Sequence, residues 1–191
     1  MIMIILDIET TGLSAATNQI IIIGILKNDK VRQLIAKTEK EEKKILKKFD
    51  NIVANSVGPL VGFNIKRFDI PFIIARCLKH GVELSGSGLR FFLSKDRYCY
   101  EVIDLKDLCI DYLKFQRGEF GLDHICKVFG IEKSEINIEE LLPRVLKDNN
   151  AFNKVKEKNK EDLKATKTLY EKFEKVLGDL REIYLRERTF S

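Results

Sequence analysis

Residues 3–13 read Met-Ile-Ile-Leu-Asp-Ile-Glu-Thr-Thr-Gly-Leu, an apolar run that ends in two acids and a short turn. The side chains of a β-strand alternate between its two faces, so Asp7 and Glu9 should emerge together on one face. Two neighbouring carboxylates repel each other unless a cation or a shared proton offsets their charge. Oxygen ligands of this kind suit magnesium or manganese better than zinc. The stretch therefore predicts a candidate metal site at a strand end, against the alternative that both acids simply end the strand in water.

The rest of the chain predicts a mixed β-sheet flanked by helices. Apolar patterns near residues 19–26 and 31–36 indicate two more strands, close enough to the first to form a meander. Helical periodicity and short apolar runs then alternate. We expect a helix at 38–55, a strand at 60–63, a helix at 67–79, a strand at 101–105 and a largely helical remainder that breaks near Pro143. Strands that alternate with helices favour an α/β layer fold.

The composition indicates one domain over residues 1–191. With 45% hydrophobic residues, the chain can bury one sizeable core. Lys and Arg exceed Asp and Glu by 34 to 29, a mild bias that is compatible with a phosphate-bearing partner but carries little weight alone. The four cysteines have no CxxC spacing and are expected to be reduced thiols. The opening apolar run is too short to cross a bilayer and is unlike a secretory leader, so we expect a cytoplasmic protein with no membrane partner.

A second polar motif lies where the strand near residue 60 meets the following helix. Residues 62–69 read Gly-Phe-Asn-Ile-Lys-Arg-Phe-Asp. Asn64 would stand at the end of the strand and Asp69 in the first turn of the helix, both beside Asp7. Simple structural roles are the alternatives: Asn64 would cap the helix, and Asp69 would offset the helix dipole.

The motif LDIETTGL at residues 6–13 and the motif at 62–69 resemble the first two motifs of the DEDD (DnaQ-like) 3′-5′ exonucleases, which have an RNase H-like fold. The resemblance spans roughly residues 3 to 175 and looks nearest to the exonuclease domain of family B DNA polymerases. It implies an α/β fold with an RNase H-like mixed β-sheet, three antiparallel strands followed by parallel strands, flanked by helices. The family carries its fourth acid on a late helix, which points to Asp162; the alternative is a solvated acid on a charged helix.

The resemblance also implies a site for two divalent cations, Mg²⁺ or Mn²⁺. Asp7 would bridge both ions, Glu9 and Asp162 would complete one site, and Asp69 would hold the other, often through water. Two cations about 4 Å apart can activate a water, neutralise charge on phosphorus and stabilise the departing oxygen. The implied reaction is hydrolysis at the 3′ end of single-stranded nucleic acid, DNA more than RNA, with release of nucleoside 5′-monophosphates.

The contacts with the nucleic-acid strand also follow from the resemblance. Thr10 and Leu13 would engage the terminal nucleotide, Leu13 as an apolar wedge against the base, while Phe63 and Asn64 would flank the strand. Such contacts are largely independent of base sequence. A polymerase or a DNA-repair protein would be a suitable partner for a solitary exonuclease domain, although the sequence identifies none.

One position departs from the family pattern. The family carries a Tyr four residues, or a His five residues, before its last Asp, and these positions are Lys158 and Glu157 here. The Tyr or His orients or deprotonates the attacking water. Lys158 would take part in catalysis as a neutral amine if its pKa were lowered, or it would bind a phosphate. The main alternative is therefore a nucleic-acid-binding module with weak or lost catalysis; a different RNase H-like nuclease and a protein-interaction domain are the others.

A poorly periodic stretch at residues 83–98 combines cations with aromatic side chains, among them Phe91 and Phe92. Aromatic rings stack on bases of any sequence, and each stacked base contributes about 1 to 3 kcal/mol. We expect Phe91→Ala combined with Phe92→Ala to weaken binding of single-stranded DNA and to leave metal affinity unchanged. Fluorescence anisotropy with a labelled oligonucleotide measures the first, and Mn²⁺ titration measures the second. Unchanged strand affinity would refute the stacking role.

Overall fold

A five-stranded mixed sheet in the order β3-β2-β1-β4-β5 lies at the centre of the fold. The computed structural model describes residues 3–56, 58–84, 102–116, 120–134, 136–180 and 182–183. Strands β1 (Ile4–Thr10), β2 (Ile20–Lys27) and β3 (Lys30–Ile35) form an antiparallel meander. β4 (Leu60–Gly62) runs parallel to β1, and β5 (Val102–Asp104) runs parallel to β4. This order confirms the expected sheet of three antiparallel strands followed by parallel strands.

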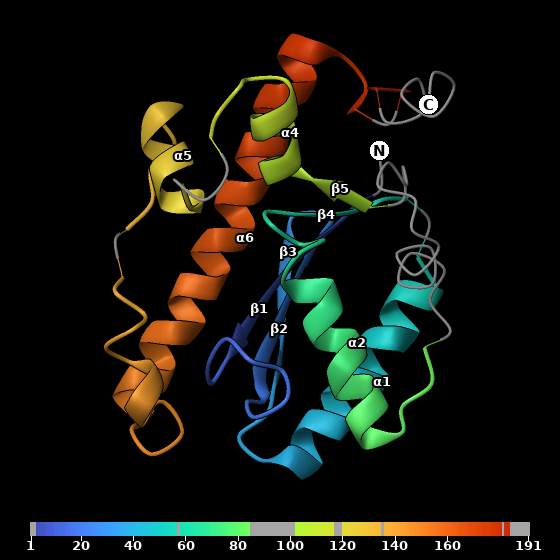
Figure 1. Cartoon of the computed structure of the whole chain (residues 1–191), viewed down its shortest axis with the longest axis vertical. Helices are drawn as coiled ribbons and strands as arrows, with labels where there is room; N and C mark the ends of the chain where they lie inside the picture. The colour runs from blue at the N-terminus through green and yellow to red at the C-terminus, as the bar shows by residue number, and fades with distance from the viewer. Residues whose placement is uncertain are drawn as a thin grey trace.

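Helices cover both faces of the sheet, as Figure 1 shows. α1 (Glu39–Ala54) and α2 (Asp69–His80) lie on one face. α4 (Leu105–Asp111), α5 (Leu122–Val128) and the long α6 (Asn149–Leu177) lie on the other. The expected break contains a short 3-10 helix, Leu142–Arg144. The described chain between α5 and this turn is less helical than expected. Gly130, just after α5, has a φ of 61°, a left-handed conformation that commonly ends a helix.

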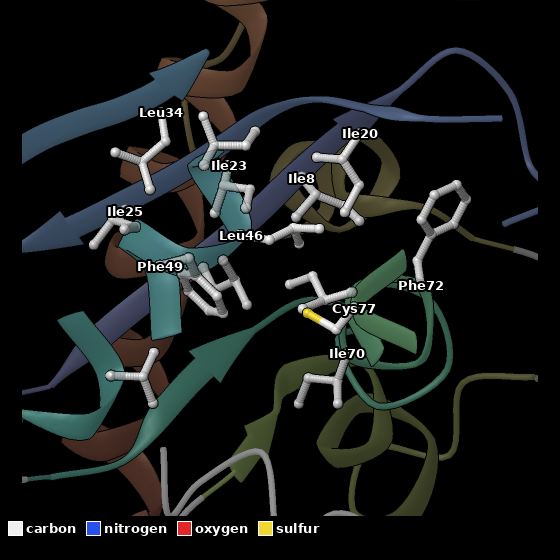
Figure 2. Packing of buried hydrophobic residues seen from close by; sticks show 14 of the residues in the cluster. Ile8, Ile20, Ile23, Ile25, Leu34, Leu46, Phe49, Ile70, Phe72 and Cys77 are labelled. Carbon is white, nitrogen blue, oxygen red and sulfur yellow. The ribbon is translucent and has the colours of Figure 1, made fainter. Parts of the chain in front are cut away.

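The side chains of β1 divide between two cores. Ile4, Leu6 and Ile8 pack under α1 and α2 in the core that Figure 2 shows, where Ile8 is labelled. Ile5 points to the opposite face, into the core that includes α4, α5 and α6. Asp7 and Glu9 follow the same period as Ile5 and contact side chains of α6. The alternation read from the sequence therefore places both acids on the α6 side of the sheet.

Local signals set the ends of the helices. The Thr38 side chain accepts the N–H of Glu41 at 3.3 Å, and the Glu41 side chain accepts the N–H of Thr38, which makes a capping box at the start of α1. Gly81 ends α2 at a φ of 59°, in the left-handed conformation. α6 is 29 residues long but rich in Lys and Glu, and no helix in the described part of the chain combines the length and the apolar character needed to cross a bilayer.

A buried ion pair joins α1 to α2 and to the start of β2. The side chains of Glu42 and Arg76 are fully buried, and Nη2 of Arg76 lies 2.6 Å from Oε2 of Glu42. Glu42 also accepts the backbone N–H of Ile20 at 2.7 Å and lies 2.7 Å from Nε2 of His80. Removing one partner of such a pair leaves the other charge inside the protein without compensation.

We expect Glu42→Ala to lower the free energy of unfolding by about 3 to 5 kcal/mol, because the Arg76 guanidinium loses its main partner in the interior. Lys43→Ala, at an exposed position on the same turn, should change it by less than about 0.5 kcal/mol. Urea denaturation followed by circular dichroism measures both variants. Equal losses in the two variants would contradict the stabilising role of the pair.

Candidate active site: a buried carboxylate cluster

Three carboxylates from two elements meet beside the end of β1. Asp7 and Glu9 come from β1, and Asp162 comes from α6. One carboxylate oxygen of each residue lies within 4.8 Å of the other two. Glu9 and Asp162 are 7% and 4% exposed, so water screens their charges poorly. The structure thus gathers three of the four acids that the sequence singles out.

Asp69, the fourth acid, adjoins the cluster and is held by the backbone. It is the first residue of α2, and its side chain is buried. Its Oδ1 accepts the backbone N–H of Ile8 at 2.9 Å. β4 pairs with β1 only at Ile4 and Ile5, so Ile8 lies beyond the reach of that strand and uses Asp69 as its acceptor. Within the described chain, the group of oxygens that meet within 4.8 Å does not include Asp69.

The motif at residues 62–69 sets the path of the chain between β4 and Asp69. A Cβ at Gly62 would lie only 2.8 Å from the Cβ of Ile65, so no larger residue fits there without a shift. The backbone N–H of Asn64 donates to the buried carboxylate of Asp104 at 2.9 Å. Asn64 has a φ of 64°, a left-handed conformation that Asn adopts more readily than most residues. These local constraints direct Asp69 towards β1.

Two lysine side chains enter the cluster. Lys158, one turn before Asp162 on α6, pairs through Nζ with Oδ2 of Asp162 and lies 3.6 Å from Oε1 of Glu9. Lys133 Nζ lies 2.7 Å from Oδ1 of Asp162 and also pairs with Asp123. The Lys133 side chain is only 3% exposed, so its ammonium group is shielded from water in both ion pairs. The two ammonium groups supply positive charge that the buried acids need.

Burial raises the pKa values of the acids around β1. Desolvation, together with the nearby charge of Asp162, raises the pKa of Asp7 to about 7. Desolvation also raises the pKa of Glu9, although the ammonium of Lys158 opposes this shift. The pKa of Asp69 is raised by burial and then by the charge of Asp7. Ionising these groups together is costly, and a bound dication would reduce that cost.

The pKa of Lys158 is raised above its ordinary value. Burial disfavours the ammonium, but the carboxylates of Glu9, Asp162 and Asp7 more than offset this effect. These surroundings favour the charged amine, which binds phosphate, over the neutral amine, which would accept a proton from water.

The donor set fits a hard divalent cation. All the candidate ligands are carboxylate oxygens, which Mg²⁺ and Mn²⁺ prefer. Oε1 of Glu9 is buried and has no hydrogen-bond partner among the described residues, since Lys158 Nζ at 3.6 Å is too distant. A buried oxygen without a partner is uncommon in proteins, and a metal ion would satisfy it. Asp7, Glu9 and Asp162 are therefore placed to hold an ion, with Asp69 beside them.

The last residue of β1, Thr10, and the turn that follows it carry two of the residues expected to contact a nucleotide. Leu13 is 85% exposed, which is unusual for a large apolar side chain and leaves it free to contact a ligand. Thr10 is buried, and its hydroxyl donates to the carbonyl oxygen of Gly12 at 2.7 Å. The hydroxyl oxygen of Thr10 can still accept a hydrogen bond.

The other expected contacts differ in their surroundings. Phe63 packs edge-on against Phe120 with ring centroids 6.3 Å apart, so part of its ring belongs to the core. The side-chain amide of Asn64 makes no hydrogen bond within the described chain and is free for a ligand. Phe91 and Phe92 lie outside the described residues.

Sequence reasoning missed two residues of the site. Asn159 is fully buried and donates through Nδ2 to Oδ2 of Asp7 at 2.7 Å. Gly24 is the signal that could have revealed it, because a lone glycine inside an isoleucine-rich strand indicates a close approach by another element. Lys133 carries no comparable signal, since it lies in an irregular segment far in sequence from Asp162.

A model of a known protein family covers most of this chain. A family model described as the RNase_H superfamily matches residues 4–174. The uncharacterized protein MJ0365 of Methanocaldococcus jannaschii is 29% identical in an alignment of 183 residues that covers 92% of this chain and 94% of the relative.

Solved structures show the same fold at low sequence identity. A family B DNA polymerase from Pyrobaculum calidifontis superposes with a TM-score of 0.68 at 17% identity, over 90% of this chain and 24% of the polymerase. A product-bound exonuclease I gives 0.61 at 13% identity, over 95% of this chain and 45% of the exonuclease. Exonuclease I from Methylocaldum szegediense gives 0.60 at 11% identity, over 95% of this chain and 42% of the enzyme. The chain thus spans less than half of each of these proteins, and the matches confirm the expected exonuclease-like fold.

We expect divalent cations to stabilise the protein more at pH 8 than at pH 6. Because the pKa of Asp7 rises from 3.8 to about 7 on folding, metal-free stability falls as the pH rises between these values, and at pH 6 an entering ion must displace a proton. At pH 8 the Asp7 carboxylate is largely ionised, so a proton on Asp7 competes less with the ion. Differential scanning fluorimetry with Mg²⁺ or Mn²⁺ should show the larger rise in melting temperature at pH 8, and Asp7→Asn should abolish it. An equal rise at pH 6 would contradict a site that protons compete for.

Proposed function

The chain belongs to the RNase H superfamily, and from this membership and its carboxylate site we propose that it is a metal-dependent 3′-5′ exonuclease. Its substrate would be the 3′ end of single-stranded nucleic acid, DNA in preference to RNA, and its products would be nucleoside 5′-monophosphates. The likeness in fold to two exonuclease I structures supports this reaction class. A cytoplasmic role in DNA repair, alone or beside a polymerase, is the setting we propose for the activity.

One observation carries the proposal. Asp7 and Glu9, Asp69, and Asp162 come from three elements that are far apart in sequence, yet they adjoin one another. Glu9, Asp69 and Asp162 are buried there, and Asp7 is half-buried. Desolvation and mutual repulsion both oppose such a gathering, so proteins seldom keep one without a functional reason. The buried oxygen of Glu9, which has no hydrogen-bond partner in the described part of the chain, supports a cation as that reason.

Asp7, Glu9, Asp69 and Asp162 would hold two divalent cations, Mg²⁺ or Mn²⁺. Bound there, the ions would supply an activated water and would neutralise charge on the phosphate and the departing 3′ oxygen. The chain itself contributes a fixed arrangement of ligands. β1 fixes Asp7 and Glu9, while the hydrogen bond to the N–H of Ile8 fixes Asp69.

Lys158 would bind a non-bridging oxygen of the scissile phosphate. Its surroundings keep it charged, so it donates hydrogen bonds and does not accept a proton. In this role Lys158 takes the place of the family's Tyr or His in the site without taking over the activation of water. The same residue also favours the second candidate function, a catalytically silent reader of strand ends, because Lys158 is paired with the metal-ligand candidate Asp162.

The strand end would lie over the turn after β1. Leu13 would press against the terminal base as an apolar wedge, and its high exposure supports this role. Asn64 would use its free side-chain amide to bind the strand, with Phe63 beside it. Thr10 would accept a hydrogen bond from the terminal nucleotide through its hydroxyl oxygen.

A gel assay of 5′-labelled single-stranded DNA with Mg²⁺ or Mn²⁺ tests the proposal. We expect a ladder of products shortened from the 3′ end, which Asp7→Ala abolishes because the site would lose one of its metal ligands. Lys158→Ala should slow the reaction by about 10- to 100-fold, since a hydrogen bond from a charged group is worth about 1.5 to 3 kcal/mol. Lys154→Ala, at an exposed position of the same helix, should leave the rate unchanged.

The same gel also separates the alternatives. A matching RNA strand should be shortened more slowly than DNA. If neither metal supports shortening while the labelled strand is still bound, the exonuclease proposal fails and the silent reader replaces it.

A further inference from the structure

Asp7, Gly24 and Gln33 form one row across the sheet. In the strand register, Asp7 lies opposite Gly24, and Gly24 lies opposite Gln33. Residues that pair across neighbouring strands direct their side chains to the same face, which here is the face that α6 covers. Because the middle position of the row is a glycine, a gap separates the side chains of Asp7 and Gln33.

Asn159 of α6 fills this gap. A Cβ on residue 24 would lie 2.3 Å from Oδ1 of Asn159, so a larger residue there would displace the amide. Nδ2 of Asn159 donates to Oδ2 of Asp7 at 2.7 Å, and Oδ1 of Asn159 accepts from Nε2 of Gln33 at 2.8 Å. Nε2 of Gln33 also donates to the carbonyl oxygen of Lys156 at 2.8 Å.

The polarity of these hydrogen bonds allows only one orientation of the Asn159 amide. The carbonyl of Lys156 is an acceptor, so it requires the nitrogen of the Gln33 amide. That nitrogen in turn requires the oxygen of Asn159, which leaves the nitrogen of Asn159 facing Asp7. An inverted Asn159 amide would set an oxygen against the Asp7 carboxylate. A chain of fixed polarity therefore runs from the backbone of α6 through Gln33 to Asp7.

We propose that Gln33 and Asn159 are positioning residues that hold the Asp7 carboxylate ready for a metal ion, and that Gly24 provides the space for them. The inference rests on the proposed function, in which Asp7 is a metal ligand. A neutral amide orients the carboxylate and leaves its negative charge in place. A lysine ammonium would instead neutralise that charge. Hydrogen bonds to metal ligands from such outer residues change metal affinity by about 10- to 100-fold when they are lost.

Gln33→Glu separates positioning from simple charge. A carboxylate at position 33 can only accept, so it would draw Nδ2 of Asn159 towards itself and turn Oδ1 towards Asp7. Its negative charge alone would strengthen the binding of a cation. Inversion of the Asn159 amide would lower Mn²⁺ affinity, whereas the added charge would raise it. The direction in which the affinity changes therefore shows which effect is larger. We expect Mn²⁺ affinity, measured without nucleic acid by electron paramagnetic resonance of free Mn²⁺, to fall about tenfold.

Two control variants complete the experiment. Arg32→Gln makes the same change in net charge at the neighbouring exposed position of β3, and it should leave Mn²⁺ affinity unchanged or slightly higher. Gln33→Met removes the hydrogen bonds of residue 33 without inverting the Asn159 amide. Its loss of Mn²⁺ affinity should therefore be smaller than that of Gln33→Glu. Metal-free melting temperatures show whether each variant is folded when its affinity is measured.

The outcomes distinguish this inference from the proposed function. Unchanged or tighter Mn²⁺ binding by folded Gln33→Glu would overturn the positioning role and leave the exonuclease proposal intact. If the natural chain binds no Mn²⁺, the metal-dependent function and the positioning role both fail.

Discussion

The cost of holding several carboxylates side by side away from water governs the arrangement around β1. Burial raises the pKa of Asp7 to about 7 and also raises those of Glu9 and Asp69. Each surrounding contact reduces this cost in a different way. Lys158 and Lys133 bring positive charge, and the backbone N–H of Ile8 and the amide of Asn159 bring neutral donors. Positive charge and hydrogen bonds thus offset the repulsion between the acids. A cation would add to them at the oxygen of Glu9 that has no hydrogen-bond partner among the residues that the structure describes.

Helix α6 contributes more side chains to the contacts around these acids than any other described element. Within two turns it supplies Lys158, Asn159 and Asp162, all directed at the acids of β1. Side chains three and four residues apart lie on one face of a helix, so these contacts share one placement of the helix on the sheet. Gly24 permits the close approach, and Gln33 ties the backbone of α6 to β3. A shift of α6 along the sheet would therefore disturb ligand, cation and amide together.

Much of this arrangement could be predicted from the sequence because it follows from local periodicity. Strand alternation puts Asp7 and Glu9 on one face, and the motif at 62–69 places Asp69 at the start of a helix. The contacts that complete the site could not be predicted from the sequence. They join residues that are distant in the sequence, and they depend on the geometry of the side chains. Lys133 reaches Asp162 from an irregular segment. The pKa of Lys158 is lowered by burial and raised by the carboxylates around it. No sequence motif shows which of the two effects is larger.

Lys158 would couple metal binding to strand binding in the proposed exonuclease, which an uncharged tyrosine at this position would not do. Its ammonium pairs with Asp162 and lies near Glu9, two of the residues that would hold a cation. An ion bound by these carboxylates would repel the ammonium, which would then pair with another anion. The phosphate of a bound strand would be such a group. In turn, a strand that holds Lys158 leaves the carboxylates free for the ion. Metal binding and strand binding would therefore favour each other through one side chain, since any effect of one ligand on the affinity for another is reciprocal.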